Sequence, residues 1–132
     1  MIDTTRSIFV IEDEEAFVQT YNEIFKFAGF QLSDWAFSGE EAVSKYRDRT
    51  KDPDLIIMDH RLPGMNGVET MIQIIRMDHS AKVLFVSADE TAKNLSLENG
   101  AVGFIQKPFS IDEFIRAVEE NISGRTEQSR SI

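Results

Sequence analysis

A short apolar run, Leu-Ile-Ile-Met at residues 55–58, ends directly in an acidic residue, Asp59, and a turn-rich stretch follows at 60–67. A continuous apolar run of this length is typical of a strand that is buried on both faces of a parallel sheet. A second such run, at residues 8–11, ends in four consecutive acids at 12–15. Open α/β sheets place their chemistry at the carboxyl ends of their strands. The two runs therefore predict a parallel sheet with one shared anionic site at its edge.

Strand-like and helix-like patterns alternate five times along the chain. Apolar residues recur with helical spacing or follow capping signals in five segments, which predict helices over 14–28, from Ser38, from Gly67, over 89–99 and from Ser110. Strands are expected between them at 7–12, 31–36, 55–58, 82–86 and 102–105. Because residues 31–36 mix polar and apolar side chains, we place that strand at an edge of the sheet. The alternation predicts a doubly wound α/β fold, a five-stranded parallel sheet with five helices.

Length and composition bound the class of protein. The chain has 132 residues, the size of one ordinary domain, and we expect that domain over 1–124 and a flexible tail or the start of a linker over 125–132. The absence of cysteine excludes disulfides, thiolate zinc sites and thiol nucleophiles. A net charge of −9 argues against direct nucleic-acid binding. No apolar stretch approaches the ~18 residues of a membrane span, and no signal peptide is evident, so we expect a cytoplasmic protein that does not bind membranes.

Polar side chains follow four of the predicted strands. Right-handed crossovers place the carboxyl ends of parallel strands on one edge of the sheet, which brings together Glu12 with Asp13, Asp59, Ser87 and Lys107. Two carboxylates about 4 Å apart repel by roughly 4 kcal/mol at an effective dielectric constant near 20. A magnesium ion, which prefers oxygen ligands, would relieve this repulsion. The strand ends therefore predict a magnesium site.

The same residues suggest phosphoryl transfer. A carboxylate can act as a nucleophile and form an acyl phosphate. This chemistry depends on in-line positioning and on cations near the phosphoryl oxygens more than on acid–base groups. Magnesium, Lys107 and the Ser87 hydroxyl would supply that electrostatic stabilisation.

Four segments together resemble the receiver domain of two-component response regulators. They are residues 8–14, Asp59 with 62–67, residues 86–88 and residues 107–109, and the resemblance covers about residues 7–122. It implies a flavodoxin-like sheet with the strand order 2-1-3-4-5 and a cis peptide bond before Pro108. It also implies a signalling domain that is not an enzyme beyond catalysing its own phosphorylation and dephosphorylation.

The resemblance implies a role for each residue of the predicted site. Asp59 would be the phosphoacceptor, and Ser87 and Lys107 would contact the phosphoryl group. The magnesium ligands would be Glu12, Asp13, Asp59 and the backbone carbonyl of Arg61.

Further residues would connect the site to signalling. Phe104 would be the switch aromatic that turns inward when Ser87 moves toward the phosphoryl group, and the side chains of Arg61 and Asp89 would tune the lifetime of that group. A histidine kinase or phosphotransfer protein would be the donor. The face made by the last two helices and the strand between them would respond, and would bind an unknown downstream protein or a second copy of the chain.

Alternative functions stay open on the sequence. The chain could be a receiver-like module that a partner binds constitutively, without phosphorylation. A flavodoxin-like FMN carrier would need a phosphate-binding loop after the first strand, where residues 12–15 are anionic. A phosphatase of the haloacid dehalogenase type would place its nucleophile after the first strand and would leave Asp59 without a role.

Several side chains also have simpler interpretations. Glu14 and Glu15 are interpreted as solvated residues of a first helical turn, where acids favour the helix dipole. Ser87 could cap the helix expected over 89–99, with Glu90 as its capping-box partner. His60 is interpreted as a loop side chain rather than a catalyst.

Overall fold

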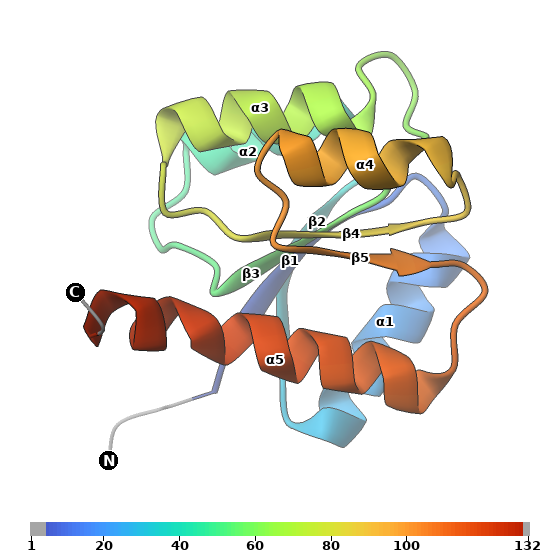
Figure 1. The fold of residues 1–132 in the computed structure, drawn as a ribbon, viewed down its shortest axis with the longest axis vertical. Coiled ribbons are helices and arrows are strands. Elements are labelled where there is room, and N and C mark those ends of the chain that lie inside the picture. Colours follow the sequence, from blue (N-terminus) through green and yellow to red (C-terminus); the bar gives the residue numbers. More distant parts are fainter. Residues whose placement is uncertain (1–4, 131–132) are drawn as a thin grey trace.

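In the computed structural model, residues 5–130 are described, with side chains from 5 to 122. They form one parallel sheet, in the order β2-β1-β3-β4-β5, and five helices (Figure 1). The strands are β1 Ser7–Ile11, β2 Gln31–Ala36, β3 Leu55–Met58, β4 Val83–Ser87 and β5 Gly103–Gln106. The helices are α1 Glu15–Ala28, α2 Gly39–Arg47, α3 Gly67–Met77, α4 Thr91–Glu98 and α5 Ile111–Arg130. The predicted fold, strand order and edge position of β2 are confirmed.

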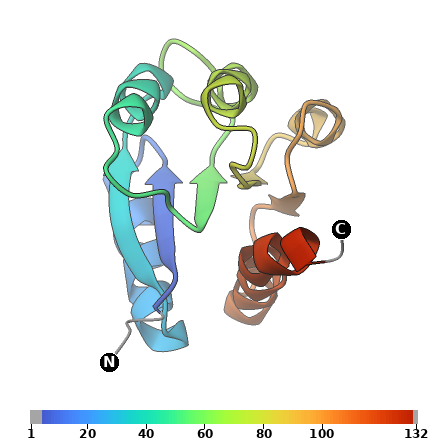
Figure 2. The same ribbon diagram turned by 90° about the vertical axis from the view of Figure 1, so that its left-hand side faces the viewer.

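Helices cover both faces of the sheet. Figure 2 shows α1 and α5 on one side and α2, α3 and α4 on the other. The strands alternate between two cores: Ile8 and Val10 of β1 pack with α1 and α5, whereas Phe9 and Ile11 pack with residues of α2 and α3. This two-sided burial explains why the sequence of β1 is a continuous apolar run rather than an alternating one.

The ends of several elements differ from the predicted ones. The strands β1, β4 and β5 are shifted or shortened by a residue, so that Glu12 lies just beyond β1 and Ser87 is the last residue of β4. The interpretation of Ser87 as a cap of α4 is wrong. Its Oγ accepts a hydrogen bond from the Asp89 amide at 3.1 Å, and it is the Asp89 carboxylate that accepts from the Thr91 amide, at 3.0 Å. Ser87 does not cap the helix because it still belongs to the sheet, opposite Gln106. The N-cap position of α4 is Glu90, whose side chain makes no capping bond.

Capping bonds define other helix ends. The Ser110 hydroxyl accepts from the Glu113 amide at 3.0 Å, as the capping-box pattern predicts, and Ser38 holds the Glu41 amide in the same way at 3.1 Å. The backbone of α5 continues to Arg130, so Gly124 does not end regular structure. The division of the chain into 1–124 and 125–132 therefore stays a prediction, and residues 131–132 lie outside the described part.

At Trp35, on the β2 edge of the sheet, side chains of the same chain bond the outward-facing backbone groups. At Trp35 in β2, the backbone amide donates to Asp34 Oδ1 at 2.8 Å, and the carbonyl oxygen accepts from Lys45 Nζ at 2.7 Å. The Lys45 ammonium also lies 5.9 Å from the centre of the indole ring. Backbone groups that would otherwise pair with another strand are thus occupied. Within the described residues, no helix combines the length and apolar character that crossing a membrane requires.

Candidate functional site

A cleft of about 520 Å³ opens at the carboxyl ends of β3, β4 and β5, beside the start of α1. It is lined by Asp13, Glu14, Phe17, Asp59, Arg61, Ser87, Ala88, Lys107, Pro108 and Phe109. Most of the predicted site residues therefore meet in one place. Glu12 lies buried beside them, 1% exposed, and is joined to the cleft through Lys107.

The backbone fixes Asp59 at the floor of the cleft. Its amide donates to the Ile11 carbonyl of β1 at 3.0 Å, and its carboxylate oxygen Oδ1 accepts from the His60 amide at 2.8 Å. Gly67, at the start of α3, packs so closely that a Cβ there would overlap the Asp59 carbonyl oxygen. The residue is only 9% exposed. The carboxylate is therefore held in a fixed, largely buried position.

Lys107 provides the cation of the site. Its Nζ lies 3.0 Å from Glu12 Oε1 and 3.9 Å from Asp59 Oδ2. Its own amide donates to the Ser87 carbonyl at 2.9 Å. The bond from Lys107 to Pro108 is cis, as the resemblance implied. One lysine thus contacts both buried carboxylates.

Burial leaves the carboxylates short of compensating charge. Desolvation raises the pKa of Glu12 to about 7, although Lys107 opposes the shift. Desolvation also raises the pKa of Asp59, against the effect of Lys107 and of the His60 and Arg61 amides. A carboxylate whose pKa is raised in this way is destabilised in its charged form. The site therefore favours an added cation.

The donor atoms suit magnesium. Carboxylate oxygens of Glu12, Asp13 and Glu14 all lie within 4.8 Å of one another, and Asp59 faces the same cleft. An all-oxygen set with several carboxylates is the kind that magnesium binds. The residues present therefore fit the predicted metal. Glu14 is exposed, in agreement with its interpretation as a solvated residue at the start of α1, and it also lines the cleft and belongs to this carboxylate group.

Ser87, Arg61 and Asp89 lie around the mouth of the cleft. Ser87 is 1% exposed, and its hydroxyl holds the start of the loop that contains Asp89. Arg61 Nε lies 3.8 Å from Asp89 Oδ2. Hydrogen bonds from Thr91, followed by the charge of Arg61, lower the pKa of Asp89. The two side chains predicted to tune the phosphoryl lifetime therefore contact each other.

Phe104 and His60 lie away from the lining of the cleft. Phe104 is half-buried in β5, opposite Phe85 of β4, and packs against the core on the α2–α3 side. The His60 ring lies 6.4 Å from that of Phe85, and its Nδ1 is buried with no hydrogen-bond partner among the described residues. Both rings thus border β4, the strand that ends in Ser87.

An aromatic group beside the cleft was not predicted. Phe17 lines the cleft, and its ring lies 6.2 Å from that of Tyr21, which stacks on Phe109 and Phe114. The Tyr21 hydroxyl is buried with no partner among the described residues, and burial followed by the charges of Glu12 and Asp59 raises its pKa. In the sequence, Phe17 and Tyr21 were recognised only as part of the apolar face of α1. Helical spacing alone gives no sign that this face ends at a charged site.

Comparisons with known proteins agree with this geometry. Residues 8–119 match the family model of the response regulator receiver domain. The chemotaxis protein CheY of Listeria monocytogenes is 37% identical over 114 residues, covering 84% of this chain and 94% of that protein. The CheX–CheY–BeF3–magnesium complex from Borrelia burgdorferi contains a chain with a TM-score of 0.81 and 30% identity, with 87% of each chain covered.

A more distant structure shares the fold. The receiver domain of a Pseudomonas aeruginosa sensor histidine kinase, solved with magnesium coordinated in its active-site cleft, has a TM-score of 0.79 at 20% identity, over 90% of this chain and 98% of that one. The fold, the cleft and the family match lead to one conclusion. The chain belongs to the receiver domain family of response regulators and resembles its chemotaxis-type single receivers.

Proposed function

We propose that this receiver is a switch that accepts a phosphoryl group on Asp59 from a phosphohistidine of a histidine kinase or phosphotransfer protein. The observation that carries the proposal is the position of Asp59, a buried carboxylate 3.9 Å from the Lys107 ammonium at the floor of a cleft that also contains Ser87. Receiver domains are signalling domains rather than classical enzymes. The proposed chemistry is therefore a reversible modification of the protein itself.

The transfer is a substitution at phosphorus. A bond forms between an Asp59 carboxylate oxygen and phosphorus while the bond from phosphorus to the donor imidazole nitrogen breaks, and the electron pair of that bond stays on the nitrogen. Lys107 would stabilise the charge on the phosphoryl oxygens, and the Ser87 hydroxyl would donate a hydrogen bond to one of them. Attack of water on the acyl phosphate would later return Asp59 and inorganic phosphate.

Receiver domains generally bind magnesium in their active site. In this chain, Glu12, Asp13, Asp59 and the Arg61 carbonyl would hold the ion. When bound, magnesium neutralises charge on the phosphoryl oxygens and on the carboxylates. The raised pKa values of Glu12 and Asp59 support a site that favours such an ion.

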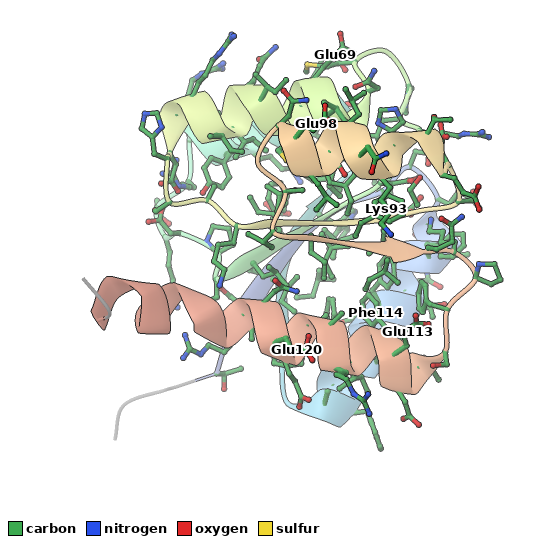
Figure 3. All side chains as sticks on the ribbon, viewed as in Figure 1. Glu69, Lys93, Glu98, Glu113, Phe114 and Glu120 are labelled. Carbon is green, nitrogen blue, oxygen red and sulfur yellow. The ribbon has the colours of Figure 1, made fainter. Side chains whose placement is uncertain are left out.

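The switch would act through the face that α4, β5 and α5 form. Ser87 and Phe104 would move together, because Phe104 borders the strand that ends in Ser87. Figure 3 shows Lys93 and Glu98 on α4 and Glu113 and Glu120 on α5, while Phe114 points into the core. Leu95 and Val102 are exposed, at 46% and 38%. A face that mixes charges with exposed apolar side chains suits a regulated protein partner or a second copy of the chain.

The test is incubation with acetyl phosphate and magnesium, followed by intact mass measurement. Wild type is expected to gain one phosphoryl group. Asp59→Asn should gain none, because an amide is not a nucleophile for this reaction, and wild type without a divalent cation should gain little. Glu69→Gln, a change in an exposed acid of α3, is the matched control and should behave as wild type.

The competing function is a receiver-like module that a partner binds constitutively. It would be favoured if folded wild type stayed unmodified with both donor and magnesium present. Incorporation into Asp59→Asn at the wild-type level would instead place the modification elsewhere. Either result would overturn the proposed function.

A further inference from the structure

The aromatic ring of Phe17 lies against Lys107, the lysine of the cleft. The Lys107 ammonium lies over this ring, 4.0 Å from its centre. Phe17 is the third residue of α1, and its half-buried side chain lines the cleft. A cation held at this distance over an aromatic face is attracted by the negative charge density of the ring, and the attraction grows when water is excluded.

Lys107 is sheltered enough for this contact to matter. Its side chain is 13% exposed, and its partners among the described residues are Glu12, Asp59 and the Phe17 ring. The ring is itself braced, because Tyr21 lies against Phe17 on α1 and stacks on Phe109, two residues after Lys107. Ring contacts thus connect Phe17 to the segment that carries Lys107.

The three partners of Lys107 differ in what happens to them during the proposed reaction. The charge of Glu12 would be partly neutralised by the metal ion, and Asp59 would become an acyl phosphate. Both carboxylates would therefore attract the lysine less strongly than before. The Phe17 ring is neutral and binds neither the metal ion nor the phosphoryl group. It is the contact that stays available to the ammonium before and after transfer.

We infer that Phe17 is a positioning residue, which holds the Lys107 ammonium in the cleft by a cation–π contact so that it is ready to bind the phosphoryl group. The inference rests on the proposed function. It assigns to α1 a part in phosphoryl binding that is separate from the metal-binding acids just before that helix.

The test measures affinity for beryllofluoride, a phosphoryl mimic, with magnesium present, by fluorine NMR. Phe17→Leu keeps an apolar side chain but removes the ring, and is expected to weaken binding about threefold to thirtyfold, the range of a cation–π contact in a partly dry site. Phe17→Tyr keeps the ring and should restore binding to within about twofold of wild type.

The matched control is Phe25→Leu. Phe25 lies on the same helix and in the same aromatic group, and its ring contacts among the described residues are with Tyr21, Phe30 and Phe114 rather than with Lys107. This variant should lower the melting temperature, because Phe25 is fully buried, and leave beryllofluoride affinity unchanged. Equal loss of affinity in both variants would mean that Phe17 acts only through stability and would overturn the inference.

A double-mutant cycle tests the route of the effect. In a Lys107→Met background, Phe17→Leu should cause no further loss of affinity, because the contact it removes is already gone. A loss as large as in the wild-type background would show that Phe17 does not act through Lys107. If Phe17→Leu does not fold, Phe17→Met serves the same comparison with a more flexible apolar side chain.

A second measurement does not depend on phosphoryl binding. Because Lys107 Nζ lies over the Phe17 ring, the protons on the neighbouring Cε should show upfield-shifted NMR signals in wild type. These signals should move to ordinary positions in Phe17→Leu. If wild type fails to bind beryllofluoride while the upfield shift is present, the proposed function fails and the contact stands. If wild type binds and the shift is absent, only the inference fails.

Discussion

Two partly buried aspartates in this molecule have pKa values that are shifted in opposite directions. Asp59 lies in the cleft, where burial raises its pKa despite Lys107 and two backbone amides. Asp78 lies at the end of α3, where burial would also raise the pKa, but bonds from Tyr46, Ser80 and Arg49 outweigh it and lower the pKa. The Tyr46 hydroxyl donates to Asp78 at 2.6 Å, and the Ser80 hydroxyl donates at 2.7 Å.

The difference separates a structural acid from a reactive one. Asp78 has donors on both of its oxygens and stabilises the junction between α2 and the end of α3. Asp59 has fewer donors than its burial demands, and its neighbour Glu12 shares the same cation. Such a site is short of positive charge, which a bound cation would supply. Groups with strongly perturbed pKa values in a cleft are candidates for function for this reason.

The largest effect is expected for Glu12 as the pH changes. Its pKa rises from 4.5 in the unfolded chain to about 7 in the folded protein, so the unfolded state releases the proton first. Its contribution to stability is present below pH 4.5 and is lost as the pH rises to about 7. Wild type without divalent cations should therefore lose on the order of 3 kcal/mol in the free energy of unfolding over this pH range, and Glu12→Gln should not show this loss.

Urea unfolding at about pH 5 and about pH 8 measures this difference. Glu120→Gln, a change in an exposed acid of α5, is the control and should follow the wild-type pH profile. If the free energy of unfolding of wild type does not fall between the two pH values, Glu12 does not have the raised pKa assigned to it.

The next largest effect is expected on stability when Asp78 is replaced. Asp78→Ala removes charge-assisted hydrogen bonds and leaves the Tyr46 hydroxyl without its partner, at a cost of about 2 to 3 kcal/mol in the free energy of unfolding. Phosphoryl incorporation in the folded fraction should be unchanged. Denaturant unfolding and intact mass on the same sample check both statements. Loss of phosphorylation at full folding would show that the two regions are coupled.

Magnesium should stabilise the cleft but not the Asp78 network. At about ten times its dissociation constant, a ligand that binds only the folded state adds about 1.4 kcal/mol. Thermal unfolding with and without magnesium should show this gain in wild type and in Asp78→Ala. Asp13→Asn should show a much smaller gain, since it loses a proposed ligand. A gain of the same size in Asp13→Asn would place the ion elsewhere.

The smallest effects are expected where the cleft meets solvent. Asp89→Ala removes the carboxylate that accepts from the Thr91 amide at the start of α4 and should lower stability modestly. Arg61→Ala breaks only its ion pair with Asp89, in which the arginine side chain is 76% exposed, and should change stability by less than about 0.5 kcal/mol. Chemical denaturation measures the loss of stability in the two variants. A larger loss in Arg61→Ala than in Asp89→Ala would contradict this prediction.

The sequence predicted the sheet and the position of Asp59 because both follow from local rules. Apolar runs mark buried strands, and parallel strands bring their carboxyl ends together. The same rules located Ser87 and Lys107 at the cleft. Their individual roles came from resemblance to a family, because spacing alone cannot distinguish a phosphoacceptor from a metal ligand.

Contacts that depend on packing between distant segments could not be predicted. The contact of the Phe17 ring with Lys107 depends on how α1 packs beside the segment that follows β5, and the apolar pattern of α1 specifies only which face is buried. The donors around Asp78 come from α2 and from the loop after α3. The start of α4 lies beyond the cap that the Ser87 pattern indicated, because capping patterns do not reveal where a strand stops pairing.

The position of Trp35 on the β2 edge also has a spectroscopic consequence. Trp35 is the only tryptophan in the chain, and it lies on the edge strand, in contact with Lys45 and Phe37 and not among the residues that line the cleft. Its fluorescence should therefore report unfolding and events at the sheet edge, while remaining nearly silent to ligands in the cleft. A tryptophan introduced near the cleft would give an optical signal for phosphorylation, which could then be read separately from global unfolding once Trp35 is replaced.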